Sequence, residues 1–295
     1  MKQTLEIFDT TLRDGAQTEG ISFSVHDKLE IAKTLDAFGI QYIEAGNPGS
    51  NPKDMEFFAA ASRLELTHAK LVAFGSTRRK GISVECDANV QSLLAANTPC
   101  VSIFGKSWDL HVIDVLSTTL EENLQSIRET VRFFKEKGKE VFFDAEHFFD
   151  GWRNNRGYAL HVLHAAVQGG ADVLVLCDTN GGTAPMDVYE IVSAVCAEYH
   201  GKRIGIHCHN DTGCAVANSM LAVQAGAVHV QGTFAGLGER CGNADLGVLI
   251  PNLQLKEGHR CIEGSLEHLY ETEMKIAEIA NISVPNNKPY IGESA

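Results

Sequence analysis

The stretch GIHCHND (Gly205–Asp211) decides the fold, because it ends an apolar run with two histidines in alternation. Side chains two positions apart on a β-strand point to the same side, so His207 and His209 would face one space together. One divalent cation can bind both imidazoles from such a strand. A strand that delivers ligands from its carboxyl end is typical of a parallel barrel, whose binding sites lie at that end.

A carboxylate that would complete this site lies near the start of the chain, in DTTLRDG (Asp9–Gly15). Asp14, with Arg13 beside it, comes just after the first apolar run. In a closed barrel only the eighth strand separates the first from the seventh, so Asp14 would reach the same mouth as the histidines. A carboxylate, two imidazoles and a guanidinium suit a site that chelates and polarises a small oxygen-rich substrate. The alternative is a turn carboxylate beside a surface arginine.

Strand-like and helix-like segments alternate along the chain about every 30 residues, which is the spacing of βα units. Most of the strand-like segments are continuous apolar runs, as expected for parallel strands covered on both faces. Eight strands are predicted, at Leu5–Phe8, Tyr42–Ala45, Leu71–Phe74, Cys100–Phe104, Val141–Ala145, Val173–Cys177, Ile204–His207 and His229–Gly232. They predict an α/β protein with a (β/α)8 TIM barrel over residues 1–257. A doubly wound open sheet is the alternative, although no GxGxxG follows the first strand.

Helix boundaries are also marked in the sequence. Ser24 is predicted to cap a helix that ends at Gly39, and Thr119 with Glu122 predicts a capping box at the start of another. One more helix is predicted from Gly258 to about Asn281, so that residues 258–295 form a short C-terminal helical extension. A loop with two prolines follows and no closing helix comes after it, which we interpret as the interruption of a longer protein.

Composition narrows the function classes. The chain has 295 residues and a formal net charge of −13, which argues against a nucleic-acid or anionic-membrane surface. No apolar run approaches the roughly 18 residues of a membrane span, and Met1–Glu6 does not resemble a signal peptide. Eight cysteines without a CxxC pair predict free thiols in a reducing cytoplasm. By alternation, Cys208 is predicted to face the helix layer rather than the site.

Three further polar residues end or follow predicted strands. Glu146 ends the fifth, where it could act as a base or form a structural ion pair. Thr179 ends the sixth and could hold a substrate carboxylate or cap the next helix. Asn243, after the eighth, could be a fourth metal ligand or a helix N-cap. The triplet Arg78–Lys80 could be a solvated face or could meet an anionic group such as a nucleotide phosphate, and we favour the second.

Five motifs, in this order, resemble the acyl-CoA-condensing members of the metal-dependent DRE-TIM barrels: DTTLRDGAQ, YIEAGNPGSNPKD, CDTNGG, GIHCHND and GERCGNADL. That group includes the 2-isopropylmalate, homocitrate and citramalate synthases. Four stretches are most similar to the citramalate synthase branch: SNPKD (50–54), AFGSTRRKG (73–81), IFGKSWDLHV (103–112) and DAEHFFDG (144–151). The resemblance covers essentially the whole chain.

The resemblance implies a Claisen-type condensation of acetyl-CoA with a 2-oxo acid, with pyruvate as the expected acceptor, in a cytoplasmic homodimer. It implies a divalent ion (Mg, Mn, Co or Zn), whose ligands would be Asp14, His207, His209 and Asn243. By the same resemblance, Arg13 is the polarising arginine, Thr179 binds the substrate carboxylate, and Glu146 is the base. Alternatives are 2-isopropylmalate or homocitrate synthesis, a lyase or aldolase of the same barrel family, and a metal-binding barrel that serves only as an interaction or sensor module.

Two departures from the family pattern stand out. Ala235 occupies a position where the family usually has asparagine, which weakens any claim of a substrate contact there. The chain also ends before a stretch whose histidine, in relatives, reaches the site of a partner subunit. The loop that contains Cys241 does not resemble the glycine-rich loop in which related lyases carry a reactive cysteine.

Overall fold

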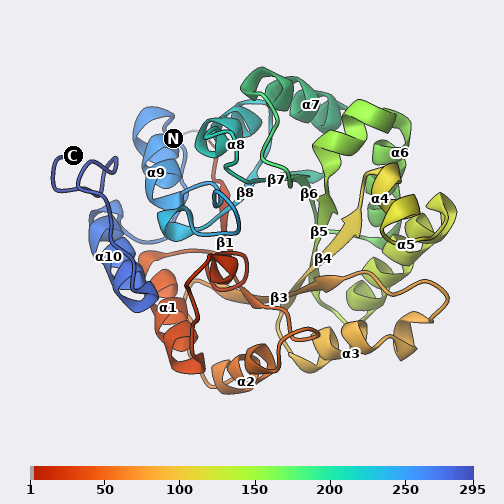
Figure 1. The fold of residues 1–295 in the computed structure, drawn as a ribbon, viewed down its shortest axis with the longest axis horizontal. Helices are drawn as coiled ribbons and strands as arrows, with labels where there is room; N and C mark the ends of the chain where they lie inside the picture. Colours follow the sequence, from red (N-terminus) through yellow and green to blue (C-terminus); the bar gives the residue numbers. More distant parts are fainter. Residues whose placement is uncertain (1–2) are drawn as a thin grey trace.

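Eight parallel strands close into a barrel in the order β1 to β8 (Figure 1). The structure, a computed structural model, describes residues 3–295, so the first two residues of the Met1–Glu6 prediction lie outside it. The strands are β1 Glu6–Asp9, β2 Tyr42–Gly46, β3 Lys70–Ser76, β4 Cys100–Lys106, β5 Glu140–Glu146, β6 Val173–Asp178, β7 Arg203–Cys208 and β8 His229–Gly232. All eight predicted strands are confirmed, and with them the TIM barrel.

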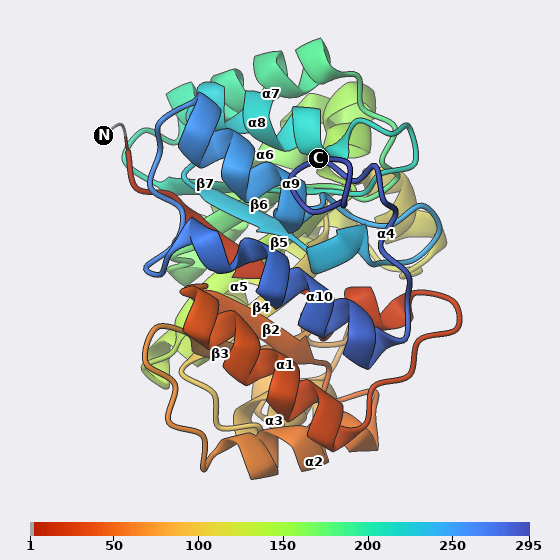
Figure 2. The same cartoon turned by 90° about the vertical axis from the view of Figure 1, so that its left-hand side faces the viewer.

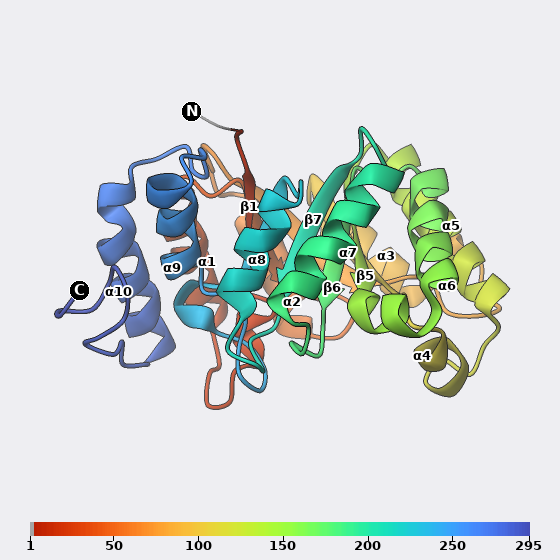
Figure 3. The same cartoon turned by 90° about the horizontal axis from the view of Figure 1, so that it is seen from above.

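Helices surround the barrel, as Figure 3 shows from another side. They are α1 Val25–Phe38, α2 Pro52–Ala61, α3 Ala88–Ala95, α4 Asp109–Asp114, α5 Leu120–Glu136, α6 Phe148–Gly169, α7 Pro185–Glu198, α8 Ala215–Gln224, α9 Leu246–Pro251 and α10 Leu269–Ala280. Within residues 3–295, no helix is long and apolar enough to cross a membrane.

Two apolar layers hold the barrel together. A large cluster fills the space between strands and helices, and a smaller one fills the barrel itself. Inside the barrel, Phe142 packs edge-on against Phe8 and Tyr42, with ring centroids 5.2 and 4.8 Å apart. Edge-to-face packing of this kind is favourable for aromatic rings. The interior is therefore a packed core rather than a pore, and active sites of this fold lie at the carboxyl ends of the strands.

The predicted helix ends are largely confirmed. Ser24 caps α1 in a capping box with Asp27, and Gly39 ends that helix in the left-handed conformation, with φ 95°. Thr119 accepts a hydrogen bond from the Glu122 backbone, so the second box is present in one direction. The second hydrogen bond of the box, from the Thr119 backbone to the Glu122 carboxylate, is absent because that carboxylate pairs instead with the Arg78 guanidinium, 2.7 Å away.

The predicted helix over 258–281 is wrong in its first half. Only α10 and a short 3₁₀ turn at Leu266–His268 are helical there. The preceding segment stays extended because Arg260 pairs with the chain before β1, where the Leu5 backbone donates to its carbonyl at 2.8 Å. Beyond it, α10 packs beside α1 (Figure 2). A domain division at residue 257 remains a prediction.

Ala235 lies in the left-handed region, with φ 57° and ψ 13°, in the loop that follows β8. Asparagine tolerates this conformation better than alanine, which explains in physical terms why an asparagine is expected there. We expect Ala235→Gly to raise the free energy of unfolding by about 1 kcal/mol, because glycine has no Cβ to clash. Thermal unfolding will measure it.

The matched control is Ala59→Gly on the exposed face of α2, which should lower the free energy of unfolding by about 1 kcal/mol because glycine is a poor helix former. If both substitutions destabilise the protein, the strain at Ala235 is not relieved by glycine.

Candidate metal centre and active site

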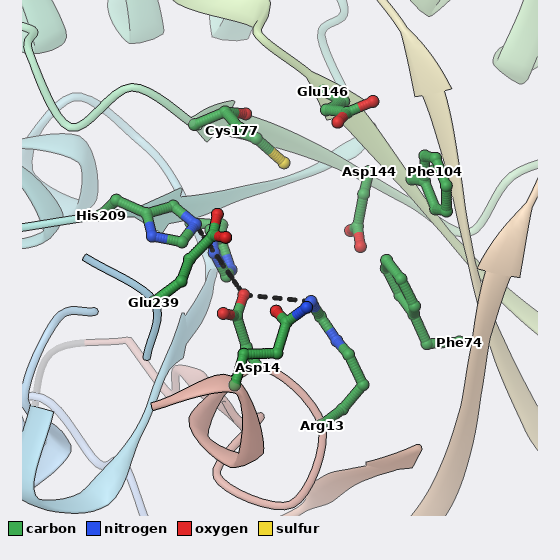
Figure 4. A pocket seen from close by; sticks show the side chains of 12 residues that line it. Arg13, Asp14, Phe74, Phe104, Asp144, Glu146, Cys177, His209 and Glu239 are labelled. Atoms are coloured by element: carbon green, nitrogen blue, oxygen red, sulfur yellow. Dashed lines mark hydrogen bonds and ion pairs between the residues drawn. The ribbon is translucent and has the colours of Figure 1, made fainter. Parts of the chain in front are cut away.

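Asp14, His207 and His209 converge at the carboxyl end of the barrel. Figure 4 shows Asp14 between His209 and Arg13. The Nε2 atoms of the two histidines are 3.4 Å apart. The Asp14 Oδ2 lies 3.5 Å from Nε2 of His207 and 3.8 Å from Nε2 of His209. All three side chains are buried. The expected convergence of one residue from the β1 end with two from the β7 end is therefore present in the structure.

The spacing of these donor atoms fits a metal ion. Ligand bonds of about 2.1 Å at tetrahedral angles place donor atoms about 3.4 Å apart, close to the observed separations. Asp14 Oδ1 and Asn243 Oδ1 are buried and find no hydrogen-bond partner among the described residues, and unpaired polar atoms of this kind need a partner such as an ion. The residues present thus fit a divalent metal.

Asn243 lies next to this cluster. Its backbone forms an antiparallel bridge with His209, and its Nδ2 donates to the Leu237 carbonyl at 3.0 Å. That hydrogen bond leaves the side-chain oxygen free. The alternative of a helix N-cap is wrong, because Asp245 caps α9. A role for Asn243 as a ligand remains a prediction.

The charges around the cluster favour the metal-binding protonation states of Asp14 and His209. At His207, burial would lower the pKa, but the hydrogen bond to Asp14 and the charge of that carboxylate raise it. Burial by itself would raise the pKa of Asp14, but the adjacent Arg13 guanidinium and the two histidines lower it well below the usual range. Burial and the neighbouring His207 lower the pKa of His209 to about 3. A neutral imidazole and an ionised carboxylate are the forms that bind metals.

Arg13 is held in place from three sides. Its Nε donates to Glu44 at 2.6 Å, and its Nη1 donates to Asp14 at 3.1 Å. The guanidinium carbon lies 3.8 Å from the centre of the Phe74 ring, in a cation–π contact. The Thr10 hydroxyl also donates to Glu44, at 2.6 Å. The surface-arginine alternative is therefore wrong.

Glu146 ends β5 and lines the cavity above the metal cluster. Its Oε2 lies 2.6 Å from the Lys106 ammonium, which comes from the neighbouring strand β4. The ion pair of the structural alternative is therefore present, and a role for Glu146 as a base remains a prediction.

Thr179 lines the same cavity, and its hydroxyl accepts a hydrogen bond from the His147 backbone at 2.9 Å. It does not cap α7, whose N-cap is Ala184. His147 itself adopts a left-handed conformation with φ 57°, an uncommon one that clusters at functional sites. This turn leads the chain from β5 into α6 directly after Glu146.

The cavity over the cluster has a volume of about 220 Å³ and contains residues that the sequence did not reveal as a group. Phe74 and Phe104 stack with their centroids 5.1 Å apart and form one wall. Asp144 faces the cavity from β5, and burial, with the charge of Glu44, raises its pKa to about 6. Cys177 also lines it, whereas Cys208 faces the helix layer as predicted.

The basic triplet is divided in the structure. The buried Arg78 donates to Glu122 and Glu129 at 2.7 and 2.6 Å, so it is a structural residue. Lys80 donates to the Ser117 carbonyl at 2.6 Å. Arg79 is exposed, and all three line a cavity of about 600 Å³ next to Phe104. An anionic ligand for the triplet remains a prediction, and Arg78 is not free to bind it.

The chain is similar to known proteins over nearly its whole length. The HMGL-like family profile matches residues 4–283. (R)-Citramalate synthases from Aquifex aeolicus and Synechocystis are 56% and 52% identical over 100% of this chain. A probable 2-isopropylmalate synthase from Ignicoccus hospitalis is 35% identical over 100% of the chain and 70% of its own length. The chain spans about half the length of the two citramalate synthases, 56% and 55%.

Solved structures with little sequence identity share the fold. The HMG-CoA lyase of Bacillus subtilis matches with a TM-score of 0.80 at 19% identity, covering 96% of each chain. An HMG-CoA lyase from Acinetobacter baumannii, in complex with coenzyme A and 3-methylmalate, also has a TM-score of 0.80 at 19% identity and covers 99% of this chain and 97% of its own. At this identity the likeness establishes the barrel architecture.

Proposed function

Because the chain belongs to the HMGL-like family, we propose that it condenses acetyl-CoA with a 2-oxo acid in a metal-dependent reaction, with pyruvate as acceptor and (R)-citramalate as product. It would then be an acyltransferase that converts the acyl group into an alkyl group on transfer. One observation carries the proposal: Arg13, Thr179 and Glu146 line one small cavity together with the metal-ligand cluster.

Pyruvate fits the chemistry of the cavity walls. Arg13 would bind the keto oxygen, and the Thr179 hydroxyl would bind the carboxylate. The stacked rings of Phe74 and Phe104 offer an apolar surface for the methyl group.

Glu146 would start the reaction as a general base that removes a proton from the acetyl methyl group. The carbon so activated attacks the keto carbon and forms the new C–C bond. The keto oxygen then takes up a proton and becomes a hydroxyl, while Arg13 stabilises the negative charge that grows on it. Water finally cleaves the thioester, which yields free CoA and a second carboxylate and makes the overall reaction irreversible.

Asp14, His207 and His209, with Asn243 as fourth ligand, would hold a divalent ion that acts as a Lewis acid on the substrate oxygens. Imidazole and carboxylate ligands are compatible with Mg, Mn, Co or Zn. The Asp14 carboxylate would also connect such an ion to the polarising guanidinium, since Asp14 accepts a 3.1 Å hydrogen bond from Arg13.

We further propose a cytoplasmic homodimer with neither nucleic acid nor membrane as partner. The eight cysteines are free thiols in the structure, which supports a reducing compartment. The net charge of −13 opposes binding to polyanions. The dimer rests on the resemblance to the acyl-CoA-condensing synthases.

A thiol-release assay with acetyl-CoA and a panel of 2-oxo acids tests the activity. We expect pyruvate to exceed 2-oxoisovalerate in kcat/KM by at least about 10-fold, because even one methylene group is discriminated by about 1–3 kcal/mol. Cleavage of a 3-hydroxyacyl-CoA without any condensation would contradict the proposal and favour a lyase.

Phe104→Ala should shift this preference toward bulkier acceptors. Removal of one of the two stacked rings enlarges the space beside the apolar wall. The ratio of kcat/KM for 2-oxoisovalerate to that for pyruvate should therefore rise by about 10- to 100-fold. Because the ratio compares two substrates in one variant, partial loss of folded protein cancels. An unchanged ratio would remove Phe104 from the acceptor pocket.

A further inference from the structure

Gln231 contacts His207 from the side that faces away from the metal cluster. It lies on β8 directly opposite His207 on β7 and is completely buried. Its Oε1 lies 2.9 Å from the His207 Nδ1. The Nε2 of the same imidazole faces Asp14 and His209. The two nitrogens of His207 therefore have different partners, and only one of them is available to a metal.

The orientation of the Gln231 amide follows from what lies at its other end. Its Nε2 donates to the Asp144 Oδ1 at 3.4 Å, and the Ser102 hydroxyl donates to the Asp144 Oδ2 at 2.7 Å. An ionised carboxylate only accepts hydrogen bonds, so the NH₂ end of the amide must face Asp144. The carbonyl end must then face His207. In the reverse orientation, two oxygens would meet at 3.4 Å and the amide would offer a donor to the imidazole.

This orientation determines the tautomer of His207. The Gln231 carbonyl can only accept a hydrogen bond, so the Nδ1 of the neutral imidazole carries the proton. The Nε2 then carries the lone pair, which points toward Asp14 and His209. Metal-binding histidines usually donate their second nitrogen to a partner that fixes the ring and the tautomer.

We propose that Gln231 is a positioning residue that fixes the Nδ1–H tautomer and the ring orientation of His207 and thereby prepares the metal site before the ion binds. The Ser102–Asp144 pair orients the Gln231 amide, so the control of the ligand extends across the barrel interior from β4 and β5 to β8. The proposal rests on the metal-dependent function proposed above and adds a residue that does not itself touch metal or substrate.

The first test is Mn²⁺ binding by isothermal calorimetry and by electron paramagnetic resonance at pH 8. Gln231→Met keeps the length of the side chain but removes the acceptor, and should weaken Mn²⁺ binding about 10- to 100-fold. Gln231→Glu keeps an acceptor for the Nδ1–H, a role that a carboxylate commonly has, but sets its second oxygen against Asp144. It should therefore weaken Mn²⁺ binding less than Gln231→Met does.

Gln41→Met is the matched control. Gln41 accepts from the Ile7 backbone at 2.9 Å and donates to the Cys261 carbonyl at 3.0 Å, before β2 and so at the opposite end of the barrel from the metal cluster. Like Gln231→Met, the Gln41→Met variant loses the hydrogen bonds of a side-chain amide, but it should leave the Mn²⁺ affinity unchanged. Equal Mn²⁺ affinities for Gln231→Met and Gln41→Met would overturn the proposal.

A second measurement needs no substitution. Long-range ¹⁵N–¹H NMR of the metal-free protein, recorded at a pH high enough for the His207 imidazole to be neutral, should show His207 as the Nδ1–H tautomer. The Nε2–H tautomer would contradict the proposal even if Gln231→Met does not fold. The two proposals fail differently. If the unsubstituted protein binds no divalent ion, the metal-dependent function fails, whereas normal Mn²⁺ binding that is insensitive to Gln231→Met overturns only the role of Gln231.

Discussion

His207→Ala is expected to weaken Mn²⁺ binding by more than about 100-fold, since even partners outside the ligand sphere are commonly worth 10- to 100-fold. The substitution removes one of three donor atoms that lie 3.4 to 3.8 Å apart and leaves the buried Asp14 carboxylate with fewer partners. Thiol release from acetyl-CoA should fall at least as much, because the ion is proposed to activate the acceptor. Calorimetry and the thiol assay measure the two losses.

Cys208→Ala is the matched control for this experiment. Cys208 is the next residue on β7, equally buried, but it faces the helix layer. It should cost some stability and leave Mn²⁺ affinity unchanged. If both substitutions weaken binding equally, the effect arises from damage to β7 rather than from loss of a ligand. If His207→Ala binds Mn²⁺ normally, the ion binds elsewhere and the proposed centre is wrong.

Arg13→Lys is expected to lower kcat by about 100-fold or more, the usual loss when one donor to a developing oxyanion is removed. Lysine keeps the positive charge but lacks the planar fork. In the structure that fork donates to Glu44 and Asp14 at once while its face rests on Phe74. A lysine ammonium cannot make this set of contacts and also reach a substrate oxygen. Mn²⁺ affinity should change by less than about 3-fold, which separates the two roles.

Arg153→Lys is the comparison for Arg13→Lys. Arg153 is exposed on α6, where it pairs with Asp187 at 2.7 Å, and exposed ion pairs contribute little to stability. The turnover of Arg153→Lys should equal that of the unsubstituted protein. Near-normal kcat in Arg13→Lys would remove the guanidinium fork from the mechanism and leave only its charge.

The two substitutions together divide the site into a metal-binding part and an oxyanion-stabilising part. His207→Ala should weaken metal binding and turnover together, whereas Arg13→Lys should lower turnover and leave Mn²⁺ affinity nearly unchanged. Asp14 belongs to both parts, since it faces the histidines and accepts from Arg13. This shared carboxylate is the structural reason to expect that their effects on kcat are not additive.

Local periodicity was enough to predict much of this protein. Alternation along β7 places His207 and His209 on one side and Cys208 on the other, because successive side chains of a strand point to opposite faces. Continuous apolar runs at regular spacing predicted the eight strands and the barrel, and the barrel in turn brought Asp14 toward the histidines. The extended segment before α10 escaped prediction because it pairs with the chain near residue 4, far away in sequence.

The sequence by itself determined the barrel and the cluster of Asp14, His207 and His209, since both follow from strand order and from the period of a strand. Only the tertiary structure decided how this cluster is supported. Glu44 on β2 pairs with Arg13, which follows β1. Lys106 on β4 pairs with Glu146 on β5. The Gln231 amide on β8 contacts His207 on β7. These contacts depend on which side chains the closed barrel places opposite one another, and on the low polarity of a buried site, where each polar atom must find a partner.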